Sequence, residues 1–115
     1  MKTLDTLIIG AGPIGLAAAV RLLPLELSFS ILEKGKTVGN HIVNWGHIEL
    51  FSNWEESVDT KSIDFLQKKI KIDFDLEDFP TGNQFIKNYL SPLAKMSAIK
   101  KKLQLNSTVV KVTYE

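Results

Sequence analysis

Three closely spaced glycines are the residues of this chain whose type and spacing point most directly to a chemistry. Gly10, Gly12 and Gly15 follow an apolar run with the spacing G-x-G-x-x-G. In such a motif the first glycine permits a sharp strand-to-helix turn, the second lets the backbone approach a pyrophosphate, and the third lets the helix pack against the strand. Pro13 fits the first helical turn, and the helix directs unpaired N–H groups and its positive dipole end toward the phosphates. A glycine-rich turn that binds no ligand is the alternative.

An acidic residue ends the second apolar run. Glu33 follows Gly10 by 23 positions, and at a strand end its carboxylate can accept hydrogen bonds from the 2′- and 3′-hydroxyls of a ribose. The same charge would repel a 2′-phosphate, which favours FAD or NAD over NADP. For Glu33 the alternative is a solvated carboxylate. We include the adjacent Lys34 among the predicted cofactor-binding residues, with a solvated charge as its alternative.

The elements that must position these residues form a βαβ unit. The pattern predicts a buried strand over residues 3–9, a helix over 13–23 that Pro24 ends, and a second strand over 27–33. A third strand is expected over residues 103–114 beside the second one. The predicted fold is therefore an α/β, Rossmann-like unit with a parallel sheet in the order 3-2-1.

The residues between the second and third strands are expected to form helices and a long loop. A helix is predicted over residues 60–70 with Asp59 or Thr60 as its cap, and residues 71–79 alternate loosely as an extended segment. Thr81 begins a capping box before a helix that Pro92 either kinks or restarts with Ser91 as a new cap. In the aromatic loop over residues 36–54, a local hydrogen bond is the favoured role of His41.

Composition limits the function further. The chain has 115 residues, is 44% hydrophobic and 23% charged, and carries a formal charge of +1, so neither a nucleic acid nor a membrane is indicated as a partner. It contains no cysteine, which excludes a dithiol, a thiolate metal site or a disulfide within it. No metal site is predicted, and a cytoplasmic location is the default expectation.

A dinucleotide-binding sheet normally has two βαβ halves, so residues 1–115 are expected to be only the N-terminal portion of such a domain.

The sequence resembles the N-terminal part of flavin-dependent NAD(P)H oxidoreductases with two dinucleotide-binding domains, a group that includes flavin monooxygenases and thioredoxin-reductase-like proteins. Residues 10–15 are similar to the FAD fingerprint of this group, and residues 31–34 to its strand end. Residues 45–54 resemble the pattern W-x-H-V-R-x-F-S-P-W of one subgroup, with Glu49 in place of an arginine and Asn53 in place of a proline. Members of the group often have a glycine within the stretch that is Pro24-Leu25-Glu26 in this chain.

The resemblance implies FAD as the cofactor and NAD(P)H as the co-substrate of a complete enzyme. It implies that the backbone of Gly10, Gly12, Ile14 and Gly15 holds the FAD pyrophosphate, that Glu33 binds the adenosine ribose, and that Val109 lies near the adenine. It also implies that residues 45–54 approach the flavin. No residue is assigned a catalytic role, because the flavin supplies the redox chemistry.

The predicted function is therefore the FAD-binding segment of a flavin-dependent oxidoreductase. No second glycine motif for a nicotinamide is present, so the segment is not expected to be catalytically competent alone, and a completing chain or a homo-oligomer is the expected partner. Two alternatives stay open. One is the NAD-binding Rossmann domain of a dehydrogenase, and the other is a non-enzymatic remnant whose first strand is exposed along one edge.

Overall fold

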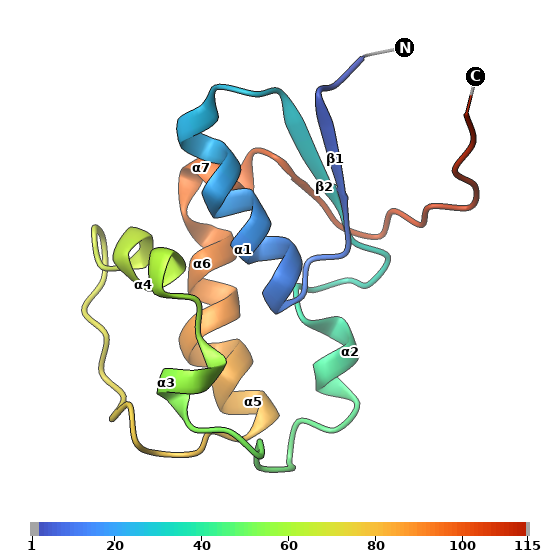
Figure 1. The fold of residues 1–115 in the computed structure, drawn as a ribbon. Helices are drawn as coiled ribbons and strands as arrows, with labels where there is room; N and C mark the ends of the chain where they lie inside the picture. The colour runs from blue at the N-terminus through green and yellow to red at the C-terminus, as the bar shows by residue number, and fades with distance from the viewer. Residues whose placement is uncertain (1–2, 115) are drawn as a thin grey trace.

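The computed structural model describes residues 3–114. Among these residues, no helix is long and apolar enough to cross a membrane. A three-stranded sheet and a set of short helices make up the fold (Figure 1). In chain order the elements are β1 (Thr6–Ile9), α1 (Pro13–Leu22), the 3-10 helix η1 (Leu23–Leu25), β2 (Phe29–Leu32), α2 (Asn40–Val43), α3 (Trp54–Ser57), α4 (Thr60–Leu66), α5 (Gly82–Phe85), the π-helix η2 (Ile86–Leu90), α6 (Ser91–Lys95), α7 (Ser97–Lys100) and β3 (Leu103–Gln104).

The sheet has the predicted order. Strand β2 lies in the middle and pairs in parallel with β1 on one side and with β3 on the other. Its Ile31 is aligned with Ile8 of β1 and with Leu103 of β3. Both the α/β class and the strand order 3-2-1 are therefore confirmed, and β1 is an edge strand as expected.

Burial alternates along β1 and β2, so one face of the sheet is covered and the other is open. Phe29 and Ile31 of β2 are buried, and α1 lies against β1 and β2 on the covered side (Figure 1). On the opposite face, Leu7 is 47% exposed and Ile9 is 58% exposed. The expectation of a buried first strand is thus wrong for Leu7 and Ile9, because no helix or strand among residues 3–114 covers their side chains.

The third strand is much shorter than predicted. It comprises Leu103 and Gln104, and the rest of the predicted range, residues 105–114, has no strand structure. Asn106 adopts the left-handed conformation with φ of 52°, which turns the backbone, and Val110 beyond it is 93% exposed. The valines favour a strand by propensity, but β2 ends at Leu32, so the later residues have no neighbouring strand to pair with.

One continuous helical stretch runs through α5, η2 and α6. Thr81 and Gln84 form the predicted capping box, with the Gln84 N–H donating to Thr81 Oγ1 at 3.1 Å. Near Pro92 the helix neither ends nor restarts, since Ser91 has helical angles and caps nothing. A π-helical turn lies directly before the proline instead. Pro92 has no N–H to donate to the preceding turn, and a widened turn accommodates that loss.

The aromatic loop folds onto this helical stretch. Trp54 is buried and stacks on Phe74 with ring centroids 3.8 Å apart, and it also contacts Phe85. Asn53, which replaces the proline of the resembling subgroup, accepts a hydrogen bond from the Glu56 N–H and caps α3. Residues 71–79 form no strand, so the loose alternation there reflects contacts such as that of Phe74 rather than pairing.

Helix α1 is tied to α4 by one charged contact. Asp59 caps α4 by accepting from the Ser62 N–H, and its carboxylate also pairs with Arg21 of α1 at 2.6 Å. Burial opposes ionisation of this carboxylate, but the hydrogen bonds from Arg21 and Ser62 outweigh it, so the pKa of Asp59 is lowered. Of the two predicted caps, Asp59 is confirmed.

This pairing makes part of the stability depend on pH. The contribution of Asp59 is fully present above its ordinary pKa of 3.8 and is lost as the pH falls through the lowered value of the folded state. Asp59→Asn keeps an oxygen for the cap but removes the charge. We expect it to lower the free energy of unfolding near pH 7 by about 0.5–1 kcal/mol, with the difference closing as the pH falls below 3.8 and through the lowered pKa of the folded state. Urea unfolding near pH 7 and over an acid pH series measures this, and Asp64→Asn on the exposed side of α4 is the control. An equal loss at every pH would contradict the charge argument.

Candidate functional site

The turn between β1 and α1 has the backbone geometry that its glycines predict. Gly10 has φ of +103°, which L side chains rarely adopt, and its N–H donates to Leu32 O at 2.7 Å. A Cβ on Gly15 would collide with the carbonyl oxygen of Gly10, so α1 starts directly against the turn. A Cβ on Gly12 would meet no atom within 4 Å. The second glycine therefore faces open space, whereas the third serves packing.

The start of α1 is well suited to an anion. Gly12 is the N-cap, no side chain caps the helix, and its first turn contains no acidic residue. Pro13 occupies the first position, where a missing N–H has no effect on helical hydrogen bonding. The N–H groups of the first turn have no partner within the helix and carry the positive end of its dipole.

Glu33 connects this turn to the end of β2. Glu33 as a whole is only 8% exposed. One carboxylate oxygen accepts from the Ala11 N–H at 2.9 Å, and the other accepts from the Gly35 N–H at 2.7 Å. Each oxygen of a carboxylate has two lone pairs, so both retain acceptor capacity for a further donor. The alternative of a solvated carboxylate is therefore wrong for Glu33.

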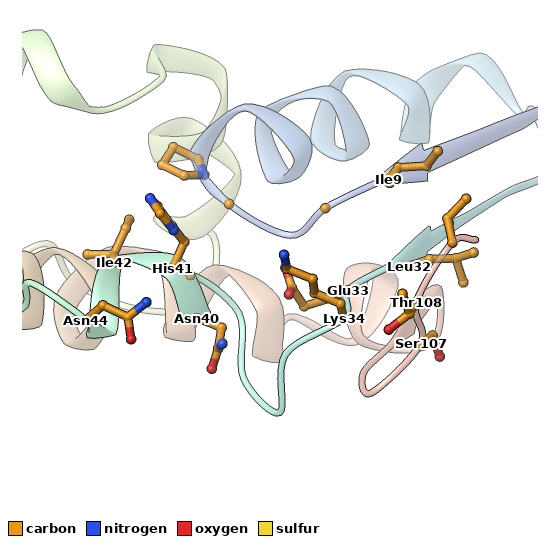
Figure 2. Close-up of a pocket in the computed structure, with 15 residues that line it drawn as sticks. Ile9, Leu32, Glu33, Lys34, Asn40, His41, Ile42, Asn44, Ser107 and Thr108 are labelled. Atoms are coloured by element: carbon orange, nitrogen blue, oxygen red, sulfur yellow. The ribbon is translucent and has the colours of Figure 1, made fainter. Parts of the chain in front are cut away.

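A cavity of about 550 Å³ opens in front of this turn, within the size range of small-ligand sites (Figure 2). It brings together most of the predicted cofactor-binding residues. Those that line it are Gly10, Gly12, Pro13, Glu33, Lys34 and Val109. The other two do not line it: Ile14 is 86% exposed on α1, and Gly15 lies behind the turn.

Val109 reaches the cavity by a route that differs from the predicted one. It does not lie in a strand, because β3 ends at Gln104. The following segment stays beside the end of β2 through two hydrogen bonds, from the Asn106 N–H to Gly35 O and from the Ser107 N–H to Glu33 O, both at 2.9 Å. These bonds place Val109 at the cavity wall.

Helix α2 supplies a wall that the sequence did not predict. Asn40, His41 and Asn44 line the cavity, and Figure 2 shows the His41 side chain directed from α2 toward the start of α1. The expectation of a local hydrogen bond for His41 is wrong, since its side chain makes none within residues 3–114. A helix of four residues has too little periodicity to be recognised in a sequence.

Residues 45–54, which were expected to approach a flavin, do not line this cavity. Trp54 of that stretch belongs to the aromatic core described above.

Within residues 3–114, no three His, Asp or Glu side chains are grouped closely enough to hold a metal ion.

A glycine turn at the carboxyl end of a parallel strand, followed by a helix whose start faces a cavity, is the arrangement of the dinucleotide-binding βαβ fold. The family model described as pyridine nucleotide-disulphide oxidoreductase matches residues 7–115. The chain belongs to this family, which confirms the resemblance to flavin- and NAD(P)H-dependent oxidoreductases.

Curated relatives are similar over part of the chain. The mitochondrial electron transfer flavoprotein-ubiquinone oxidoreductase of Arabidopsis thaliana is 42% identical in an alignment of 65 residues that covers 45% of this chain and 10% of that protein. The corresponding protein of Pseudomonas aeruginosa is 41% identical over 64 residues, covering 45% of this chain and 12% of its own length. The matched region thus spans about a tenth of these relatives.

Solved structures match almost the whole chain. The bacillithiol disulfide reductase Bdr from Bacillus cereus has a TM-score of 0.73 and 25% identity, covering 99% of this chain and 32% of that one. Bdr from Staphylococcus aureus has a TM-score of 0.64 and 27% identity, covering 93% and 29%. A steroid monooxygenase bound to NADP shares the fold with a TM-score of 0.69 at 18% identity, over 91% of this chain and 20% of that one.

The two glycines are expected to respond differently to an added methyl group. Gly15→Ala places a Cβ against the Gly10 carbonyl, and we expect it to lower the free energy of unfolding by about 2 kcal/mol. Gly12→Ala places a Cβ in open space, so its effect should stay below about 1 kcal/mol. Thermal and urea unfolding of the ligand-free variants measures both. Equal destabilisation of the two variants would contradict this division of roles.

The bridge made by Glu33 is expected to stabilise the ligand-free chain. In Glu33→Gln an amide NH₂ replaces one of the two carboxylate oxygens. Whichever way the amide is turned, its NH₂ then faces the backbone N–H of either Ala11 or Gly35, and that hydrogen bond is lost. We expect a loss of about 1–3 kcal/mol in the free energy of unfolding. Urea unfolding without nucleotide measures it, with Glu77→Gln in an exposed loop as the control. Unchanged stability in Glu33→Gln would show that the two hydrogen bonds contribute little.

Proposed function

We propose that this chain binds the ADP half of FAD at the cavity between the glycine turn, the end of β2 and α2. In this arrangement the pyrophosphate lies at the start of α1 beside Gly12, and the ribose lies at Glu33. Val109 lies close to the adenine. The observation that carries the proposal is the joint placement of the open Gly12 and the buried Glu33 on one cavity.

The contacts of Glu33 support a ribose role rather than a purely structural one. Both carboxylate oxygens keep a free lone pair while the backbone holds the group in place. A diol presents two O–H donors at a spacing that suits the two oxygens of a carboxylate. A 2′-phosphate at the same position would meet a like charge, so an unphosphorylated adenosine ribose is favoured.

The cavity residues alone suit the ADP half of either FAD or NAD, because the two cofactors share it. Family membership supports FAD, since the similar proteins include electron transfer flavoprotein-ubiquinone oxidoreductases and a steroid monooxygenase. The matched Bdr structures are about three times longer than the region covered by this chain. We propose that the isoalloxazine ring and a nicotinamide are bound by protein outside residues 3–114, either in the same polypeptide or in a partner chain.

The resulting activity is that of a flavin-dependent oxidoreductase that uses NAD(P)H. A bound flavin would supply the redox chemistry between NAD(P)H and an electron acceptor. The residues described here would contribute binding and orientation: the turn and α1 would hold the phosphates, and Glu33 would hold the ribose. No side chain of this cavity is assigned a proton-transfer step.

Titration of the 115-residue chain with FAD tests the proposal. Quenching of flavin fluorescence should saturate, and ADP should compete, because the site takes the half that both molecules share. In Gly12→Val the added side chain enters the open space in front of the turn, so we expect the affinity to fall at least about tenfold, equivalent to about 1.4 kcal/mol. Far-UV circular dichroism should show that this variant keeps the fold.

Two outcomes would contradict the proposal. One is the absence of FAD binding by a folded, monodisperse sample. The other is FAD binding that ADP does not displace and that Gly12→Val leaves unchanged, which would place the ligand elsewhere. Tight NADH binding without FAD binding would favour the dehydrogenase alternative.

A further inference from the structure

His41 lies on the wall of the cavity that faces the glycine turn. It is exposed on α2, whereas its neighbour Ile42 is buried in the core. Figure 2 shows its side chain directed toward the start of α1, while Asn40 of the same helix points the other way. Its imidazole has no hydrogen-bond partner within residues 3–114, so its donors are available to a ligand.

The backbone that carries His41 is held firmly against the glycine turn. The Gly39 N–H, two residues earlier, donates to Ala11 O at 2.9 Å. Ile42 fixes the other side of α2, and Gly82 of α5 packs so closely beneath it that an added Cβ would lie 2.9 Å from the Ile42 side chain. The distance from α2 to the turn is therefore set by the fold, and only the His41 side chain has to adjust.

The charged and imidazole side chains around the cavity bear on how it could bind an anion. Those that line the cavity are Glu33, Lys34 and His41. The start of α1 contributes no acid, and the segment with Ser107 and Thr108 contributes no charge. The charges of Glu33 and Lys34 cancel, and the His41 imidazole adds an N–H donor that can bind an anion.

We propose that His41 is a phosphate-binding residue of the dinucleotide site. Its imidazole N–H donates a hydrogen bond to a pyrophosphate oxygen held at the start of α1. The inference rests on the proposed binding of the ADP half. It assigns to α2 the role of a second phosphate contact, opposite the backbone N–H groups of the turn.

The test compares His41→Gln with His47→Gln. The second variant removes the other histidine of the chain, which is exposed and does not line the cavity. FAD is the probe, because it carries the pyrophosphate. We expect His41→Gln to raise the Kd for FAD about threefold to tenfold, because the shorter amide cannot reach the oxygen that the imidazole contacts and one hydrogen bond is lost. His47→Gln should leave the Kd unchanged.

The outcomes separate this inference from the proposed function. If FAD binds His41→Gln as tightly as the wild type, the role of His41 is wrong while the site stands. If both variants weaken FAD binding equally, the effect is not local to the cavity and the inference is again wrong. If the folded wild-type chain does not bind FAD, the proposed function fails and this inference fails with it.

Discussion

The carboxylate of Glu33 is the interaction on which the geometry of the cavity depends. It spans two segments that are separate in sequence, because one oxygen accepts from the glycine turn at Ala11 and the other from Gly35 after β2. Burial makes these bonds consequential, since an unpaired donor or acceptor in a site shielded from water is costly. The same group thus shapes the cavity in the ligand-free chain and presents free lone pairs to it. Organisation before binding lowers the ordering cost that a ligand would otherwise meet.

The hydrogen bonds that connect Gly10 and Ala11 of the glycine turn to the end of β2 and the segment after it all lie on one side of β1. Strand β1 is at the edge of the sheet, so Gly10 bonds to Leu32 of β2, and Ala11 bonds to Glu33 and Gly39. An edge strand has no second neighbouring strand that could form further hydrogen bonds with it. The position of the turn is therefore only as rigid as the region around the end of β2, which the segment through Asn106 and Ser107 reinforces.

Sequence reasoning succeeded where a residue type answers a local constraint. Gly10 needs a positive φ and Gly15 a close approach, and both needs can be recognised from spacing alone. The capping box at Thr81 is equally local. Glu26 is an instructive case: it adopts φ of 56° within the stretch where resembling proteins often have glycine. Its conformation could be anticipated only from that resemblance, because glutamate has no preference for the left-handed region.

The failures have a different physical origin, since they involve partners that are distant in sequence. Valines after Gln104 favour a strand, but strand formation requires a neighbour, and β2 has already ended at Leu32. Helix α2 exists because Ile42 is buried and Gly82 packs against it, and nothing in residues 40–43 alone specifies that contact. The orientation of His41 follows from this packing. The half of the site contributed by the turn is thus encoded locally, whereas the half contributed by α2 is a product of the tertiary fold.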